Sequence, residues 1–312
     1  RLGLVGSEMC IRDRDGSYVR QGLQKGLALK HEERGNPFKI GFIGSTDTHN
    51  GAYIFDESDN VGTAAILTSP EVRGSIPIPN ETLTEDIKNS VFIAEEDQGF
   101  YSGGETISNS VGGLAAVWAK ANTRDSIFEA LSNKETYATS GTRIRLRFFA
   151  GENLTNLDFN DEEFISKMYE NGVPMGSDLI LSDTKKPSFI IWAQKDKNSA
   201  PLQRIQIIKG FYSEKDRETK EHLIDVVCSD GLKPDPNSKL CASNNAIVNI
   251  ETCEFSKNKG ASELKTTWVD EEYDPNIETF YYVRVLENPT CRWSTWDAVS
   301  YTHLRAHETK SY

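Results

Sequence analysis

The chain has 312 residues, of which 37% are hydrophobic and 10% aromatic, enough apolar material for a sizeable core and for two domains. The formal net charge of -12 argues against nucleic acid as a partner, because binding to it requires clustered Lys and Arg that neutralise phosphates. No run approaches the roughly eighteen apolar residues of a membrane-spanning helix. We therefore expect a soluble globular protein that acts on a small-molecule substrate and does not insert into membranes.

The two ends of the chain differ from the rest. The first fourteen residues, RLGLVGSEMCIRDR, and the last fourteen, VSYTHLRAHETKSY, show neither helical nor strand periodicity. Both resemble translated transposase-adaptor sequence, so residues 1–14 and 299–312 are interpreted as adaptor-derived, the alternative being ordinary frayed tails. On this interpretation the protein is a fragment truncated at both ends, from which a signal peptide would be missing. Cys10, His303 and His307 then carry no functional weight.

Four cysteines lie between these ends, at Cys228, Cys241, Cys253 and Cys291. Four cysteines permit three pairings, of which we favour Cys228 with Cys241, around a turn-rich stretch, and Cys253 with Cys291. The alternative is four separate buried thiols, since free Cys is common in protein cores. Zinc-ribbon spacing is absent. Because disulfides persist in oxidising compartments, a periplasmic or secreted bacterial location is expected.

The amino-terminal part shows the pattern of a parallel α/β unit. Apolar residues recur every four positions over 17–33, with Ser17 as a possible N-cap, which predicts a helix. The following apolar run at 38–43 is bounded by Pro and Gly and predicts a strand buried on both faces. The polar cluster at 45–50 then lies at the carboxyl end of that strand, where α/β folds place their chemistry.

The next section mixes loops with a second helix. Periodicity fades over 51–113, and Gly, Ser, Asn and acidic residues predict long loops of the kind that form lids or binding segments. Thr123 can then cap a helix whose apolar face is Ile127, Phe128 and Leu131. The expected first domain, 15–150, ends with a strand at 144–149 that has one face exposed to solvent.

After residue 150 the pattern changes to strands alone. Runs rich in β-branched and aromatic residues are separated by Asp, Asn, Gly and Pro turns, at 189–193, 202–209, 222–227, 263–269 and 279–286. Successive strands without helices predict an antiparallel, β-sandwich-like domain over 151–298. The expected fold class is therefore α/β followed by all-β.

Asp47-Thr48-His49 is the strongest candidate for chemistry. A carboxylate and an imidazole two residues apart in extended backbone project to the same side and suit a divalent metal. The pattern is weak alone, because Asp near His also occurs in caps and turns. Catalytic zinc in addition usually has three protein ligands.

Longer motifs carry a resemblance to known families. Residues 36–51 resemble a closing metal motif of the polymerase-and-histidinol-phosphatase (PHP) superfamily, whose domain is a distorted seven-stranded β/α barrel. Residues 18–298 resemble the bacterial domain-of-unknown-function family 3604 through four separated motifs: Gly113–Ala119, Asn122–Arg124, Glu135–Ile144, and Tyr281–Glu287 with Cys291–Ser294. Tyr137–Gly141 is also similar to a segment of PHP-type carbaryl hydrolases.

This resemblance implies a metal-dependent hydrolase built on the carboxyl-terminal remnant of such a barrel. Asp47 and His49 would ligate a divalent metal, zinc or manganese, and a metal-bound hydroxide would attack a phosphoester or another ester or carbamate bond. Such proteins also carry a His-x-His pair on an earlier strand, and none is present between Asp15 and Asp47. The remaining ligands are therefore expected to be missing from this fragment, which we expect to be inactive.

Four residues are candidates for the lining of a cleft: Tyr137, Thr139, Arg143 and Arg292. Arginine suits an anionic substrate, but Tyr137 could equally be a core residue and Arg143 a surface residue, and Arg292 could stack on a neighbouring tryptophan. His31 is expected to be a solvated surface histidine. The alternative function is a non-catalytic exported binding module, whose sandwich grips polysaccharide or a protein partner, since a sandwich alone says little of function.

Overall fold

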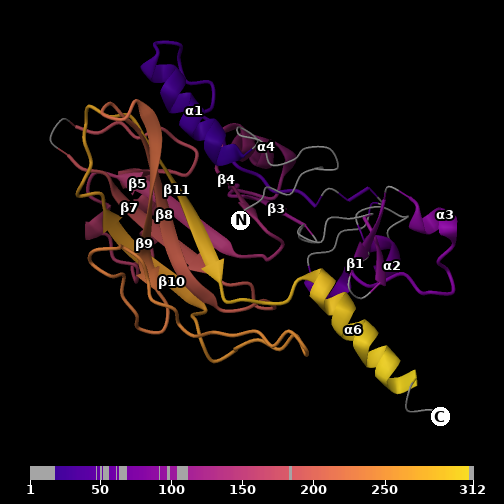
Figure 1. Ribbon diagram of the computed structural model, residues 1–312. Helices are drawn as coiled ribbons and strands as arrows, with labels where there is room; N and C mark the ends of the chain where they lie inside the picture. The colour runs from indigo at the N-terminus through magenta and orange to yellow at the C-terminus, as the bar shows by residue number, and fades with distance from the viewer. Residues whose placement is uncertain are drawn as a thin grey trace.

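The computed structural model describes residues 18–46, 48–49, 51, 56–60, 62, 69–90, 92–96, 99–103, 112–182 and 185–308, with side chains up to residue 302. It is a mixed α/β structure with few helices, and all strand pairs among these residues are antiparallel. In Figure 1 the larger sheets lie together with α1 beside them, while α6 extends away from them toward the carboxyl terminus. Among the described residues, no helix is long and apolar enough to cross a membrane.

Two antiparallel sheets form the larger part of the structure. The first has the strand order β10 (Glu263–Val269), β7 (Ser188–Gln194), β5 (Arg145–Gly151) and β6 (Gly172–Pro174). The second has the order β11 (Thr279–Glu287), β8 (Leu202–Ser213) and β9 (Glu218–Cys228). All five strands expected after residue 150 are confirmed, as is the strand expected at 144–149. The boundary at residue 150 stays a prediction, although β5 crosses it to pair with β7.

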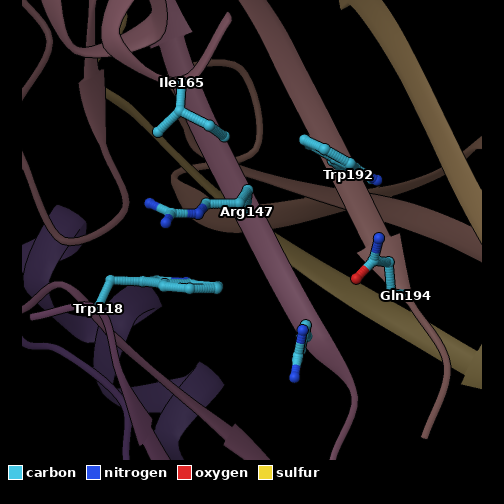
Figure 2. Close-up of a pocket in the computed structure, with 6 residues that line it drawn as sticks. Trp118, Arg147, Ile165, Trp192 and Gln194 are labelled. Atoms are coloured by element: carbon cyan, nitrogen blue, oxygen red, sulfur yellow. The ribbon is translucent and has the colours of Figure 1, made fainter. Parts of the chain in front are cut away.

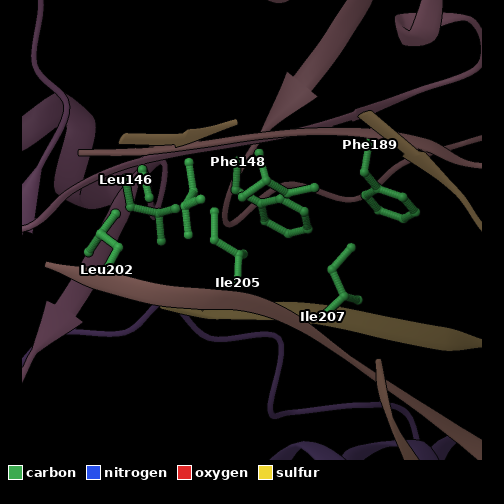
Figure 3. Close-up of a cluster of buried hydrophobic side chains, with 9 residues drawn as sticks. Leu146, Phe148, Phe189, Leu202, Ile205 and Ile207 are labelled. Carbon is green, nitrogen blue, oxygen red and sulfur yellow. The ribbon is translucent and has the colours of Figure 1, made fainter. Parts of the chain in front are cut away.

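The main hydrophobic core lies between these two sheets, in a sandwich-like arrangement. Alternate residues of each strand point inward, so apolar side chains of the first sheet meet those of the second (Figure 3): Leu146, Phe148 and Phe189 face Leu202, Ile205 and Ile207. Each fully buried side chain of this size stabilises the fold by about 1.5–3 kcal/mol relative to exposure. The period of two in these strands therefore fixes which residues form the core.

A second, smaller core covers part of the outer face of the first sheet. The short helix η2 (Leu154–Asn156) and the helix α5 (Phe164–Asn171) lie across Phe149 of β5 and Ile190 of β7. Leu154 and Met168 are fully buried there. These two helices correct the expectation of strands alone after residue 150. Since these elements cover only one end of the sheet, the outward residues at the other end remain accessible to a ligand.

The first helix, α1 (Val19–His31), is confirmed and contacts β8 and β9 of the second sheet. Ser17, its expected N-cap, lies outside the described residues, and the backbone N–H of Tyr18 donates to Oε1 of Gln21 at 3.2 Å. His31 is not simply solvated. Its ring stacks on Tyr212 with 4.0 Å between the centroids, and its Nδ1 lies 3.2 Å from Oε1 of Glu214. These contacts hold the end of the helix on the sheet.

The buried strand expected at 38–43 is wrong. These residues have no strand partner, and the side chains of Ile40 and Ile43 are 41% and 60% exposed. The physical reason is that the backbone of residues 41–46 makes no continuous series of hydrogen bonds with a neighbouring strand. They lie along the antiparallel pair of strands β3 (Leu114–Val117) and β4 (Thr136–Thr139). Among the described residues, one backbone hydrogen bond joins residues 41–46 to this pair, from the Gly113 N–H, just before β3, to the Ser45 C=O at 2.8 Å.

The helix expected after Thr123 is confirmed as α4 (Arg124–Ser132), and the Thr123 hydroxyl oxygen accepts a hydrogen bond from the Ser126 N–H at 3.3 Å. Its expected apolar face is confirmed only in part, because Ile127 is half-buried but Phe128 and Leu131 are 69% and 45% exposed. Ala130 is the buried residue of the helix. The helix therefore packs through Ile127 and Ala130 rather than through Phe128 and Leu131.

The loops expected over 51–113 are also partly wrong. The described residues there include η1 (Glu57–Asp59), α2 (Pro70–Arg73), α3 (Glu85–Lys88) and an antiparallel hairpin of β1 (Ile93–Glu96) and β2 (Gly99–Ser102). Each helix has at most four residues and each strand has four, which is too short for a periodicity to register in the sequence. The other residues of the range, among them 52–55, 63–68 and 104–111, lie outside the described part.

The two expected disulfides are present, Cys228–Cys241 and Cys253–Cys291. The second fixes the start of α6 (Trp293–Glu308). This helix corrects the expectation that residues 299–312 are not helical, at least as far as 308. Its beginning is well anchored, since Trp293 is 1% exposed and Asp297 receives a bidentate ion pair from the buried Arg73 of α2. An anchored first turn allows the helix to continue with little help from sequence periodicity.

Candidate functional site

Residues 41–46, which lead to the expected metal ligands, lie against the β3–β4 strand pair. Residues 41–46 run in the same direction as β4: a Cβ built on Gly41 would meet Thr136, and one built on Gly44 would lie 2.8 Å from the Leu114 C=O and 3.1 Å from the Thr139 C=O. Only glycine permits so close an approach of two backbones. The segment is therefore held in place by backbone contacts on its way to residues 47–49.

Of the two expected ligands, Asp47 lies outside the described residues and His49 is exposed. Between them, the Thr48 N–H donates to Oγ1 of Thr46 at 3.4 Å, and the two hydroxyl groups lie 3.1 Å apart. A Cβ on Gly112 would meet the Thr46 side chain at 2.6 Å. The turn that presents His49 is thus fixed by hydroxyl hydrogen bonds and by a glycine contact.

No group of three or more His, Cys, Asp and Glu side chains that could hold a metal occurs among the described residues. His49 is the only one of the two expected ligands that can be placed. The described side chains therefore do not make up a metal site by themselves.

Two of the expected cleft residues have structural partners. The Tyr137 hydroxyl donates to the Ile144 C=O at 2.9 Å and accepts from the Leu146 N–H at 3.3 Å. Burial raises the pKa of Tyr137, so the hydroxyl stays protonated at neutral pH. Thr139 Oγ1 accepts from the Gly141 N–H at 3.4 Å. Both side chains brace the connection from β4 to β5.

The two arginines expected in the cleft lie in different places. Arg143 is on the β4–β5 connection, where its N–H donates to Oδ2 of Asp196 at 2.8 Å. Arg292 precedes α6, and its Nη1 lies 3.4 Å from Oε1 of Glu57. The guanidinium over the Trp293 ring belongs to Arg73, 5.7 Å from the centroid. Arg143 and Arg292 therefore have different partners among the described residues.

Glu287, a half-buried residue that the sequence did not suggest, has its carboxylate near Asp196, which accepts from the Arg143 N–H. Burial raises the pKa of Glu287, hydrogen bonds from Ser199 and Thr142 oppose this, and the nearby Asp196 adds to the rise. Oε1 of Glu287 is buried with no hydrogen-bond partner among the described residues. The ionised form of Glu287 is therefore disfavoured in the folded protein.

We expect Glu287→Gln to raise the free energy of unfolding at pH 7. Because the pKa of Glu287 is raised on folding, its contribution favours the folded state below the unfolded pKa, about 4.3. That contribution is lost as the pH rises through the folded pKa. Urea midpoints of both proteins at pH 4 and pH 7 measure the effect. If the urea midpoints of the wild type and the variant differ by the same amount at both pH values, the charge of Glu287 is not the cause.

A pocket lies on the outer face of the first sheet, beside α5, which contributes Ile165 to its lining. It has a volume of about 160 Å³ and is lined by Trp118, Arg145, Arg147, Ile165, Trp192 and Gln194. Figure 2 shows Arg147 above the Trp118 ring on one side of the pocket, with Trp192 and Gln194 on the other. None of these residues was expected as a site residue.

The pocket is assembled by strand pairing. Arg147 of β5 lies opposite Trp192 of β7, and Arg145 lies opposite Gln194. Their side chains point away from the main core, because the intervening Leu146 points into it. The alternation of residues 144–149 could have indicated two arginines on one wet face. The partner residues, however, are 45 and 49 positions away in the sequence and could not be identified there.

Comparison with known proteins gives one match. A family model described as a protein of unknown function (DUF3604) matches residues 6–312. No curated protein and no solved structure matches the chain.

Proposed function

We propose that this chain, which belongs to the DUF3604 family of proteins of unknown function, is part of an exported metal-dependent hydrolase. The bond cleaved would be a phosphoester, or a carboxylic ester or carbamate. The observation that carries the proposal is that residues 41–46 are locked against β3 and β4 and lead directly to Asp47-Thr48-His49. A fixed backbone that ends in a carboxylate and an imidazole suits metal ligands, whose geometry must be held closely.

The course of residues 41–46 also supports a relation to a β/α barrel. They run in the direction of β4 beside it, as a neighbouring parallel strand would. In such a barrel the ligands come from the ends of several strands. We propose that Asp47 and His49 are the last ligands of the site, and that the others belong to a part of the parent protein that this chain lacks.

Export is supported by the two disulfides, which tie together the segments that follow β9 and β11. Disulfides of this structural kind persist in oxidising compartments and are rare in the bacterial cytosol. A periplasmic or extracellular location is part of the proposal.

The proposal is tested by assaying the product of the intact gene against chromogenic phosphate and carboxylate esters. We expect Asp47→Ala to lower turnover by about 100-fold or more, since even partners that only orient metal ligands contribute about 10- to 100-fold. Asp59→Ala, an exposed aspartate of η1, is the matched control and is expected to retain turnover within about twofold. Equal turnover in the two variants would refute the role of Asp47.

One observation favours the second candidate, an exported binding module without catalysis. The pocket on the first sheet combines two indole rings with two guanidinium groups, side chains that are common at binding surfaces. This candidate predicts that the intact gene product hydrolyses none of the esters and yet binds a ligand through the sandwich.

A further inference from the structure

The pocket lined by Trp118, Arg147 and Trp192 is rigid because its walls are bonded to the rest of the fold. The Trp118 Nε1–H donates to the Leu146 C=O at 2.7 Å. The guanidinium carbon of Arg147 lies 3.5 Å from the centroid of the Trp118 ring, and its Nη1 donates to the Tyr169 hydroxyl at 3.0 Å. Guanidinium stacked on indole in this way is a stable, partly desolvated arrangement.

The opposite wall is fixed by one carboxylate. Oε1 of Glu263 accepts hydrogen bonds from the Trp192 Nε1–H at 2.7 Å and from the Gln194 Nε2–H at 3.1 Å. This leaves the Gln194 carbonyl oxygen as an acceptor on the pocket side of the amide. The ring of Trp192 also contacts Phe164 of the second core. Both walls are therefore preorganised, which lowers the entropic cost of binding.

The charges around the pocket leave one cation without a partner. Glu135 lies 4.0 Å from Arg147, and Glu263 lies 3.5 Å from Lys265, so each acidic side chain near the pocket has its own cation. Arg145 lines the pocket and is exposed, with no hydrogen bond or ion pair to any residue in the described part of the chain. Its guanidinium can therefore form an ion pair with an anionic group of a ligand.

The volume of the pocket indicates the size of the chemical group that fits inside it. A cavity of about 150 Å³ is known to hold one benzene-sized molecule, and this pocket has about 160 Å³. Drug-sized ligands occupy larger pockets, of about 300 Å³ or more. The pocket therefore suits a single six-membered ring, with its flat face toward indole and its charged substituent toward Arg145.

We propose that this pocket binds a single six-membered ring that carries a carboxylate. The carboxylate pairs with Arg145, which offers two parallel N–H donors, and the ring packs against the indole ring of Trp192, because Arg147 already covers the Trp118 ring. A ring hydroxyl donates to the Gln194 carbonyl. Two sources share this chemistry, a sugar acid residue of a polysaccharide and an aromatic carboxylate. The proposal does not depend on the hydrolase proposal, because Asp47 and His49 are not among the lining residues.

The test titrates the purified chain with galacturonate, benzoate, galactose and sulfate, with EDTA present, and follows tryptophan fluorescence and the heat of binding. We expect saturable binding of galacturonate, benzoate or both, and at least about tenfold weaker binding of galactose and sulfate. Binding of galacturonate alone identifies a sugar-acid site, and binding of benzoate alone identifies an aromatic-acid site. Saturable binding of neither, or equal binding of galactose, overturns the proposal.

Three variants locate the site. Arg145→Gln is expected to weaken binding of the carboxylate about tenfold, the loss expected for one charge-assisted hydrogen bond of about 1.4 kcal/mol. Trp192→Phe is expected to weaken it less, and Arg124→Gln, an exposed arginine of α4, is the matched control with unchanged affinity. Equal affinities of Arg145→Gln and Arg124→Gln overturn the assignment to this pocket. Repeating the titration with Asp47→Ala, which should bind normally, separates this result from the fate of the hydrolase proposal.

Discussion

Replacing Asp225 by alanine is expected to lower the free energy of unfolding by about 3–5 kcal/mol, the usual cost of removing one partner of a buried ion pair. Asp225 is 2% exposed. Its Oδ2 accepts from Arg204 Nη1 at 2.9 Å and from the Cys241 N–H at 2.6 Å, and its Oδ1 accepts from Gln206 Nε2 at 2.6 Å. The variant removes one acceptor from each of three donors, and of these Arg204 Nη1 keeps a second acceptor, the Cys241 C=O at 3.1 Å.

Urea denaturation measures this loss as a shift of the midpoint at an unchanged slope. The matched control is Asp216→Ala, which removes an exposed aspartate paired with Lys220 next to the same strand, β9. Exposed ion pairs of this kind contribute little, so the control should denature close to the wild type. Coinciding midpoints for the two variants would mean that Asp225 does not organise β8 and β9.

Removing the Cys253–Cys291 disulfide is expected to cost about 4 kcal/mol, and removing Cys228–Cys241 about 3 kcal/mol. The order follows from the sequence separations of 38 and 13 residues, because the longer loop restricts the unfolded chain more. Each pair is replaced by two alanines and compared by urea denaturation under non-reducing conditions. Five titratable thiols in the unreduced wild-type protein, in place of the one expected from Cys10, or no stability difference between wild type and either variant, would contradict this prediction.

The strands of the sandwich-like part were predictable because their residues carry the pattern locally. β10 was expected at 263–269 and is found there, since alternating apolar and polar residues between turn residues suffice to mark a strand. The disulfide pairs were predictable for a similar reason: Cys228 and Cys241 flank a run of turn residues that brings them together. Such features depend on neighbours in the sequence.

What could not be predicted depends on distant partners. Residues 38–43 have the composition of a buried strand, yet Ile43 is exposed because the backbone beside it makes no ladder. The ion pair between Arg73 and Asp297, which anchors α6, joins residues 224 positions apart. The tail from residue 299 carries no helical periodicity of its own and continues a helix that begins with the buried Trp293.

The candidate sites divide in the same way. Asp47 and His49 could be proposed from a short motif. The structure adds the glycine contacts that hold residues 41–46 against the β3–β4 strand pair. The pocket could not be proposed, because Trp118, Arg147 and Trp192 come from three segments that only the β5–β7 pairing and the stacking of Arg147 on Trp118 bring together. Strand β3 connects the segment 41–46 with the pocket, since it begins beside Gly44 and is followed by Trp118. It has four residues and is about 13 Å long.

Titration of this chain with Mn²⁺ or Zn²⁺, followed by metal analysis after dialysis, tests most directly whether Asp47 and His49 ligate a metal. Two protein ligands hold a metal weakly, so we predict saturable but weak binding, less than one equivalent retained after dialysis, and at least tenfold weaker binding in both Asp47→Ala and His49→Ala. One equivalent of tightly held metal in this chain, or metal binding that Asp47→Ala leaves unchanged, would contradict the account.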